Sequence, residues 1–257
     1  MAAQLNPRSF VKNTLTALGL VLTLAACAHV EKEDPRDPLE SVNREIFAFN
    51  QLADEYAIEP LARGYRYITP QFARTAVNNA FYNLREPATF ANSLLQAKPQ
   101  AALNSFSRFF LNSTIGIGGL IDVAEDSAGL KKQSEDFGQT LASWGWTDST
   151  FIVVPFLGPG TIRDALGQIP DYYAHPVPYF INAWETTAFS AGEALTQREA
   201  LLEVTDDVKA NSLDPYATYR SLYLQKRDSD IHDRSSNDTA ADDAKSAGDA
   251  DAPIVEK

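Results

Sequence analysis

Apolar residues recur at helical spacing along most of the chain. Between residues 38 and 56 they return every three or four positions after Asp37-Pro38, a pair typical of a helix N-cap and first turn. A second amphipathic pattern starts at Thr69-Pro70 and should end at Pro87, because proline removes a helical hydrogen bond. We therefore expect a helix over 38–56, another from 70, and a separate one over 87–96.

The rest of the chain continues this mainly helical pattern. Helices are expected from Pro99, over 136–146, and at about 161–168, 178–204 and 213–227. The stretch 151–157 has the β-branched and aromatic content of a short strand, but Pro155 makes an extended loop equally plausible. The fold class is therefore mostly α, with no internal repeat.

A short apolar segment, residues 113–119 (Ser-Thr-Ile-Gly-Ile-Gly-Gly), differs from its surroundings. It contains three glycines, Gly116, Gly118 and Gly119. Glycine adopts backbone conformations that other residues avoid and allows other groups to approach its backbone closely. The segment is predicted to bend.

The N-terminal residues have the features of a secretory signal. Arg8 and Lys12 precede an apolar run over 14–24, which is too short to span a bilayer. The run ends at Leu24-Ala25-Ala26-Cys27, which resembles the bacterial lipobox, where the thiol receives a diacylglycerol, the chain is cut before the cysteine and the new amine is acylated. We expect residues 1–26 to be a lipoprotein signal peptide and Cys27, the only cysteine, to carry lipid. An ordinary signal peptide with a chance cysteine is the alternative.

The charge of the chain limits its partners. By resemblance to the known sorting rule, Ala28 after the lipidated cysteine favours the outer membrane, and residues 27–37 form a short charged tether. Removal of the signal leaves 20 basic and 34 acidic residues, a net charge of −14. Such a polyanion should not bind nucleic acid, and its membrane contacts beyond the anchor should be mainly hydrophobic.

The C-terminal residues, 228–257, change in composition. They contain nine acidic and three basic residues and no aromatic residue. Such a segment cannot bury enough apolar surface to offset the entropy of ordering, so we interpret it as a disordered tail. An acidic docking tail is the functional alternative.

Catalytic and metal-binding patterns are poorly represented. Only His175 of the three histidines lies inside the expected folded region, since His29 follows the anchor and His232 is in the tail. No G-x-S-x-G elbow, H-E-x-x-H pair or D-x-D-x-D-G loop is present, and Cys27 is occupied by lipid. We expect no enzyme activity, no metal and no cofactor, and interpret His175 as a surface histidine or one packed among aromatic residues.

Four groups of residues, in order, form a more specific pattern. They are Asp37-Pro38-Leu39-Glu40 with Asn43, Arg44, Phe49 and Asn50; Arg108 to Ser113, continuing through the three glycines to Asp122; Phe137 to Leu141, followed by Pro155 and Arg163-Asp164; and Asp214-Pro215-Tyr216. This pattern resembles the MlaA (VacJ) family of outer-membrane lipoproteins and covers about residues 37–227. The family-motif positions are Asn43, Phe49, Asn50, Arg108, Asn112, Asp122, Gly138, Pro155, Arg163 and Asp164.

The resemblance implies a fold and a function for residues 38–227. The fold is a ring-like array of amphipathic helices in the inner leaflet of the outer membrane, on its periplasmic side, with a glycine-rich hairpin and an amphipathic channel. Mislocalised phospholipids of the outer leaflet would pass through this channel to a periplasmic carrier of the MlaC type, which maintains lipid asymmetry, and trimeric porins would hold the ring. A structural lipoprotein that only scaffolds porins or envelope machinery is the alternative, and an envelope hydrolase is a third reading.

A specific part of this fold can be assigned to the lipid path as a hypothesis. Residues 109–123 would line or gate it, with apolar surface from one set of side chains and a bend from the glycines. The candidates are Phe109, Phe110, Leu111, Ile115, Gly116, Ile117, Gly118 and Gly119. An ordinary core with ordinary turns is an equally good interpretation of the same residues.

Overall fold

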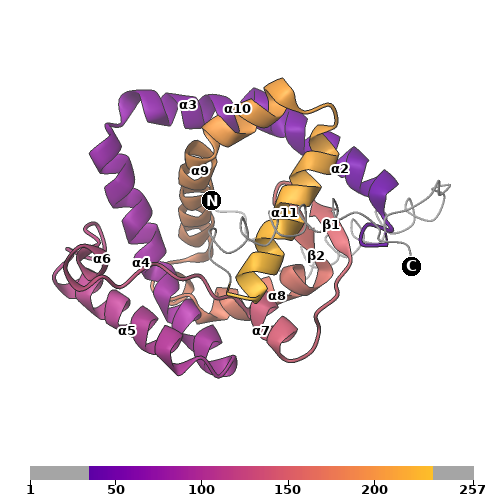
Figure 1. Cartoon of the computed structure of the whole chain (residues 1–257). Helices are drawn as coiled ribbons and strands as arrows, with labels where there is room; N and C mark the ends of the chain where they lie inside the picture. The colour runs from indigo at the N-terminus through magenta and orange to yellow at the C-terminus, as the bar shows by residue number, and fades with distance from the viewer. Residues whose placement is uncertain (1–34, 234–257) are drawn as a thin grey trace, which may run out of the picture.

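The computed structural model describes residues 35–233, which are mainly helical (Figure 1). The expectations for the signal peptide, Cys27 and residues 234–257 lie outside this range. The α-helices are α2 (Glu40–Ala53), α3 (Glu59–Ile68), α4 (Gln71–Leu95), α5 (Pro99–Thr114), α6 (Val123–Ala128), α7 (Phe137–Ser143), α8 (Ile162–Ala174), α9 (Ala183–Ala200), α10 (Leu202–Asn211) and α11 (Pro215–Ile231). A π-helix, η2 (Asp54–Ile58), joins α2 to α3, and a 3-10 helix, η3 (Val177–Tyr179), precedes α9.

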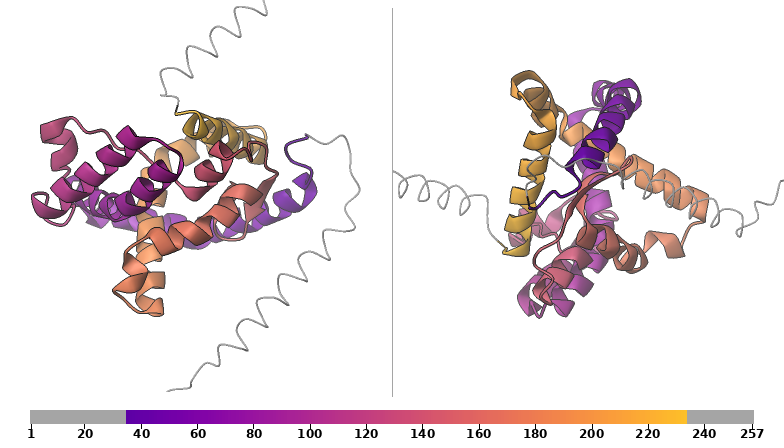
Figure 2. Two further views of the ribbon diagram at one scale, coloured as in Figure 1. Left: turned by 90° about the horizontal axis from the view of Figure 1, so that it is seen from below. Right: turned by 90° about the vertical axis from the view of Figure 1, so that its right-hand side faces the viewer.

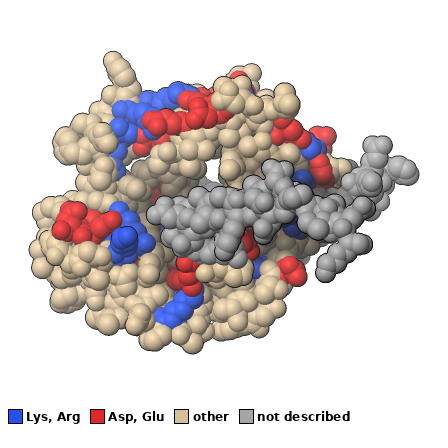
Figure 3. All heavy atoms as spheres, in the orientation of Figure 1, with Lys and Arg blue, Asp and Glu red and all other residues tan. Residues whose placement is uncertain are grey.

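These helices are arranged as a ring. In Figure 1, α2, α3, α4, α5 and α8 follow one another around its outline, and the space-filling view shows an opening near the middle (Figure 3). Seen from the edge, α11 lies on one face, while the corner formed by α8, η3 and α9 projects from the opposite face (Figure 2). The predicted mostly α, ring-like fold is confirmed. No helix within residues 35–233 combines the length and the hydropathy needed to cross a bilayer.

The expected break at Pro87 is wrong. Helix α4 runs without interruption from Gln71 to Leu95 with Pro87 inside it. An interior proline costs about 3 kcal/mol. Packing of α4 along α5 offsets this cost, because the small side chains of Ala102 and Ser105 on α5 are buried and allow the two helices to approach closely.

Several expected helix ends are also corrected. The first helix begins at Glu40, after Leu39, and helical structure continues through η2 and α3 to residue 68 instead of ending at 56. The helix expected over 178–204 is two helices, which meet at Leu201. A turn of one residue leaves the apolar spacing almost unchanged, so periodicity cannot detect it. Helices α8 and α11 extend to Ala174 and Ile231, beyond the expected ends at 168 and 227.

The ambiguous stretch 151–157 contains a strand. Strand β1 (Phe151–Val154) pairs antiparallel with β2 (Gly158–Thr161), and Pro155 lies in the turn between them, where its missing N–H breaks no ladder bond. Phe151 and Val153 point into a small core with Tyr216 of α11. The hairpin therefore connects the first helix of the ring to the last.

The distribution of polar and apolar side chains is unusual. Within residues 35–233, 21 polar or charged residues are buried against 11 hydrophobic ones, five of which are alanine. Large apolar side chains are instead exposed, for example Tyr67 at 91%, Phe72 at 78% and Phe180 at 84%. Proteins dissolved in water bury their large apolar residues and seldom expose extended apolar patches. These exposed apolar side chains suit contact with hydrocarbon.

Candidate functional site

The residues proposed from sequence to line a path lie at the end of α5 and in the connection to α6. Phe109 and Leu111 are half-buried in α5, whereas Phe110, Ile115 and Ile117 are 58%, 62% and 65% exposed. Leu120 and Ile121, farther along the connection, are exposed as well. We call residues 115–122 the glycine-rich connection, and its side chains form an apolar surface at one end of the α4–α5 pair.

The three glycines of this connection have different roles. A side chain on Gly116 would place its Cβ 2.2 Å from the carbonyl oxygen of Ile121, and one on Gly119 would lie 2.6 Å from Cβ of Asn83. Gly118 has open space around it but adopts a φ of +68°. Ile117 also has a positive φ, which strains a β-branched residue. The connection is therefore tightly packed at Gly116 and Gly119, and both Gly118 and Gly119 have a positive φ.

A buried ionic network lies beneath the connection. The Arg108 Nε donates to Glu86 Oε1 at 2.7 Å, and its Nη2 donates to Asp122 Oδ2 at 2.9 Å. The Asn112 amide donates to Asp122 Oδ1 at 2.9 Å and accepts the Ala124 N–H at the same distance. The Arg108 side chain is 1% exposed and Glu86 is fully buried. This network fixes the two ends of the glycine-rich connection to α4 and α5.

The two carboxyl groups of this network differ in pKa. Burial raises the pKa of Glu86 to about 7, although its hydrogen bond to Arg108 opposes this shift. The buried Ser105 side chain opposes the shift in the same way. For Asp122, burial alone would raise the pKa, but hydrogen bonds from Arg108, Asn112 and Lys132 lower it to about 2. The two acids that pair with Arg108 therefore differ in how readily they ionise.

Two asparagines of the family pattern attach α2 to the hairpin. The Asn43 amide donates to the Phe151 carbonyl at 3.2 Å and accepts the Val153 N–H at 2.8 Å. Asn50, seven residues on, donates to Val154 O at 2.9 Å and accepts Phe156 N–H at 2.8 Å. These side chains pair with the hairpin backbone as another strand would. Phe49, which is 47% exposed, packs edge-to-face on the Phe156 ring.

The remaining family-pattern residues close the ring where α7, α8 and α11 meet. Arg227 of α11 donates to both carboxylate oxygens of Asp136, at 2.6 and 2.7 Å, and to Asp164 at 2.6 Å. A Cβ on Gly138 would lie 2.4 Å from the Arg227 guanidinium. The buried Arg163 donates to the carbonyl of Thr147 at 2.9 Å. The family-pattern residues thus join segments of the ring that lie far apart in the sequence, and Arg108, Asn112 and Asp122 among them fix the glycine-rich connection.

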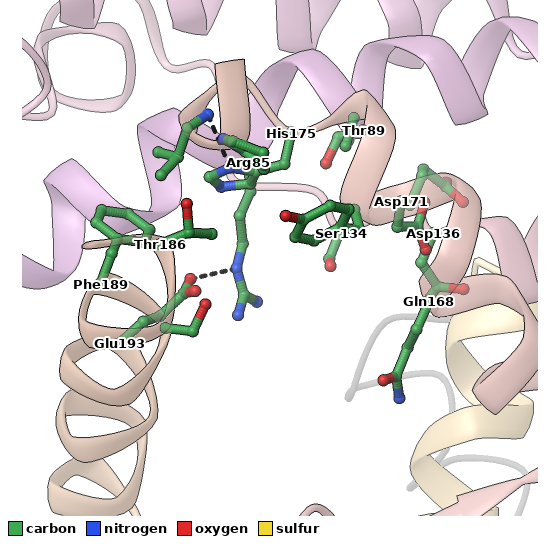
Figure 4. Close-up of a pocket in the computed structure, with 16 residues that line it drawn as sticks. Arg85, Thr89, Ser134, Asp136, Gln168, Asp171, His175, Thr186, Phe189 and Glu193 are labelled. Carbon is green, nitrogen blue, oxygen red and sulfur yellow. Dashed lines mark hydrogen bonds and ion pairs between the residues drawn. The ribbon is translucent and has the colours of Figure 1, made fainter. Parts of the chain in front are cut away.

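Sequence reasoning missed the polar side chains that line two cavities between the helices. The first, about 340 Å³, lies between α4, α8 and α9 (Figure 4). There Arg85 Nε donates to Glu193 at 2.5 Å, and the acidic side chains of Glu135 and Asp171 also face the cavity. Burial raises the pKa of both these acids. Each of these residues, taken singly, has the sequence signature of a solvated charge, so no local signal marks them.

His175 also lines this first cavity. Burial lowers its pKa, its Nδ1 accepts the Val177 N–H at 3.3 Å, and its ring lies 5.9 Å from that of Phe189. This agrees with the interpretation of a histidine packed among aromatic residues. In the part of the chain that the structure describes, no group of three or more His, Cys, Asp or Glu side chains could hold a metal ion.

The second cavity, about 350 Å³, lies where α3, α4 and α9 meet. Arg66, Arg74 and Glu199 contribute charged groups to it. In Figure 3, basic and acidic side chains lie side by side along the upper rim near α3, while the left and lower outer edges are mainly uncharged. Both cavities thus include charged side chains, while many large apolar side chains are exposed elsewhere on the molecule.

The comparison with known proteins identifies the family. A family model described as MlaA lipoprotein matches residues 35–230. The chain belongs to the MlaA lipoprotein family. The Escherichia coli intermembrane phospholipid transport system lipoprotein MlaA is 35% identical over 228 residues, which cover 85% of this chain and 88% of that protein. The Haemophilus influenzae protein of the same name is 31% identical over 230 residues, 86% of this chain and 91% of that protein.

A solved structure is also similar. It was described under "Structural basis for maintenance of bacterial outer membrane lipid asymmetry" and superposes with a TM-score of 0.68 at 34% identity, covering 76% of this chain and 98% of that chain. An uncharacterized Rickettsia bellii protein is 37% identical over 196 residues, 76% of both chains. The resemblance inferred from the four sequence motifs is confirmed, and the mostly helical fold agrees with that of an MlaA-family protein.

Proposed function

We propose that this chain is an outer-membrane lipoprotein that removes mislocalised phospholipids from the outer leaflet and passes them to a periplasmic carrier, so that the membrane keeps its lipid asymmetry. The single observation that carries the proposal is the inverted distribution of side chains in an MlaA-family ring. The names of the similar proteins, which refer to phospholipid transport and to outer-membrane lipid asymmetry, support it.

The free-energy cost of moving an unassisted phospholipid explains why such a ring would be needed. At about 0.8 kcal/mol per methylene, exposing two acyl chains of about 30 methylenes to water would cost on the order of 24 kcal/mol. Drawing a charged headgroup through hydrocarbon is similarly unfavourable. Polar side chains inside the ring and apolar ones around it would lower both barriers. Transport of this kind breaks no bond, so we propose a non-enzymatic role without nucleotide or cofactor.

The proposed anchor is a lipid on Cys27. Asp37 is fully buried and fastened to the ring by Asn43 Nδ2 at 2.8 Å and by Tyr216 Oη at 2.5 Å. The ten residues from Cys27 to Asp37 can extend roughly 33–36 Å at most. A lipid at Cys27 would therefore keep the ring close to the periplasmic side of the outer membrane, with its apolar rim in the inner leaflet.

Changing the anchor tests the proposed function. Cys27→Ala should abolish incorporation of labelled fatty acid, reduce the share of the protein in the outer membrane, and increase phospholipid in the outer leaflet, measured with an external phospholipase. The matched control is Ala28→Ser, which keeps the thiol and should keep all three properties. Acylation and normal lipid asymmetry in Cys27→Ala would contradict both the anchor and the role built on it.

The partners are part of the same proposal. We propose that phospholipid, trimeric porins and a soluble carrier of the MlaC type contact the ring, and photoreactive residues placed along 105–123 should crosslink to lipid.

Mass spectrometry of the purified protein separates the alternative functions. Bound phospholipid supports transport, its absence would favour a scaffold for porins, and release of lysolipid or fatty acid would favour a hydrolase.

A further inference from the structure

The corner where α3, α4 and α9 meet is lined by two arginines and two glutamates, of which only Glu199 is buried. Two arginines, Arg66 of α3 and Arg74 of α4, converge on one carboxylate, Glu199 of α9. Arg66 donates from Nε to Glu199 Oε1 at 2.5 Å and from Nη2 to the Glu199 carbonyl at 2.8 Å, and Arg74 contacts the same carboxylate oxygen. The only other acid here, Glu203, is 86% exposed and lies 3.3 Å from Arg66, so solvent screens it.

Two buried donors at this corner have no acceptor among the described residues. They are Arg74 Nε and the Tyr65 hydroxyl. Burial raises the pKa of Tyr65, and the charge of Glu199 acts in the same direction. Buried donors are nearly always paired in folded proteins. Arg74 lines the adjacent cavity, where an oxygen-rich anion would supply an acceptor.

The helix that begins at this corner also favours an anion. Gln71, the first residue of α4, lines the cavity, and Pro70 before it provides no side-chain cap. The N-terminus of a 25-residue helix carries partial positive charge and free N–H groups. The cavity of about 350 Å³ is also lined by Thr75 and Asn78, whose side chains can bond to phosphate oxygens.

We propose that this corner binds the phosphate of a phospholipid headgroup while the lipid passes through the ring. The inference rests on the proposed function and adds to it one binding site for the headgroup. Arginine forms paired hydrogen bonds to phosphate oxygens, so Arg66 and Arg74 hold the phosphate together. Glu199 pairs with both arginines when no lipid is bound, and the phosphate competes with Glu199 for these arginines.

The first cavity, between α4, α8 and α9, is lined by more acidic than basic side chains. Its lining includes Arg85 with the acids Glu135, Asp136, Asp171 and Glu193. A phosphate there would meet an excess of carboxylates, whatever their individual pairing. Of the two cavities, the one at the α3–α4–α9 corner therefore suits a phosphate better.

Binding measurements on the detergent-solubilised, lipidated full chain test this assignment. The probes are short-chain phosphatidylglycerol, short-chain diacylglycerol without phosphate, and inorganic phosphate, each titrated calorimetrically. The phosphatidylglycerol should bind most tightly, and Arg74→Gln should weaken it by about tenfold, as expected for loss of a charged hydrogen-bond donor. Arg66→Gln should act in the same direction.

Two further variants make the test specific. Arg63→Gln removes an arginine of the same helix that pairs instead with Glu59 and Asp206, and should leave binding unchanged. Glu199→Gln keeps the shape of the side chain but removes the competing charge, so it should tighten binding several-fold. Equal affinities for Arg74→Gln, Arg63→Gln and the unchanged chain would overturn the proposal, as would weaker binding by Glu199→Gln. Inorganic phosphate binding as tightly as phosphatidylglycerol would assign the corner to free phosphate instead of lipid.

Lipid transfer between vesicles distinguishes this proposal from the function on which it rests. If the unchanged chain moves no phospholipid while Arg74→Gln still weakens phosphatidylglycerol binding, the proposed function fails and the phosphate site stands. If the unchanged chain moves phospholipid and Arg74→Gln moves and binds it equally well, the phosphate site alone fails.

Discussion

The network beneath the glycine-rich connection and the α3–α4–α9 corner use the same residue types in opposite ways. At the first, one arginine, Arg108, meets two acids and all three side chains are at most 9% exposed. At the second, two arginines meet one buried acid, Glu199, beside a cavity. In the first, which we call the closed network, each guanidinium nitrogen of Arg108 has a partner within the chain. In the open corner a donor is left over, so the first serves to hold the fold and the second is suited to a ligand.

The two sites differ in how far their ion pairs are buried. A buried ion pair offsets its desolvation only while both partners are present, so removal of one leaves an uncompensated charge. A partly exposed pair can exchange its partner for water or for another anion at little cost. Arg108 therefore has a structural role, whereas the Arg66 side chain, 32% exposed, can exchange its partner.

The largest expected effect comes from opening the closed network. Arg108→Ala should lower the free energy of unfolding by about 3–5 kcal/mol, because Asp122 would remain buried without its main cation. The same truncation at the open corner, Arg66→Ala, should cost about 1 kcal/mol or less. Denaturant unfolding of the detergent-solubilised proteins measures both. Similar losses for the two variants would contradict the distinction between a closed and an open site.

A smaller effect is expected at Gly118 of the glycine-rich connection. Gly118→Val should destabilise the protein by about 1–2 kcal/mol, because an L residue is strained at a positive φ, and should increase outer-leaflet phospholipid if residues 109–123 gate a lipid path. Gly119 is a poor test, since its Cβ would collide with Asn83.

Gly129 provides a matched control for this variant. Gly129 and Gly118 have similar φ values, +65° and +68°, and both have open space around them. Gly129 lies at the end of α6, outside the connection. Gly129→Val should therefore carry a similar strain without changing lipid asymmetry. If both variants alter asymmetry equally at normal protein abundance, the gate hypothesis is wrong and the glycines are ordinary turns.

The two regions also differ in how far sequence could predict them. Arg108, Asn112 and Asp122 lie within 15 residues of one another and belong to a family motif, so their importance was recognisable, although their structural role was not. Arg66 and Glu199 are separated by 133 residues, and Arg74 and Glu199 by 125. Their meeting depends on the closure of the ring, which no local pattern encodes.

The same limit explains the errors in the helix boundaries. Amphipathic spacing correctly indicated helices around Leu84, Phe106 and Phe189, because it depends on neighbours in sequence. The continuity of α4 through Pro87 depends on contact with α5, and the turn at Leu201 depends on contacts between α9, α10 and α3. Sequence therefore indicated the helical content and the family, while tertiary contacts determined the boundaries and the polar interior.

The smallest expected effect concerns protonation within the closed network. The pKa of Glu86 is raised from its usual value near 4.5 to about 7, so between these pH values the folded chain holds a proton that the unfolded chain has lost. The contribution of this group to stability is thus full below about pH 4.5 and decreases as the pH rises through 7. Glu86→Gln resembles the protonated form, so it should change stability little at pH 5 but flatten this decrease. Unfolding curves recorded from pH 5 to 8 measure the slope. If Glu86→Gln retained the slope of the unchanged chain, Glu86 would be ionised throughout, and Arg108 would balance two carboxylates instead of one.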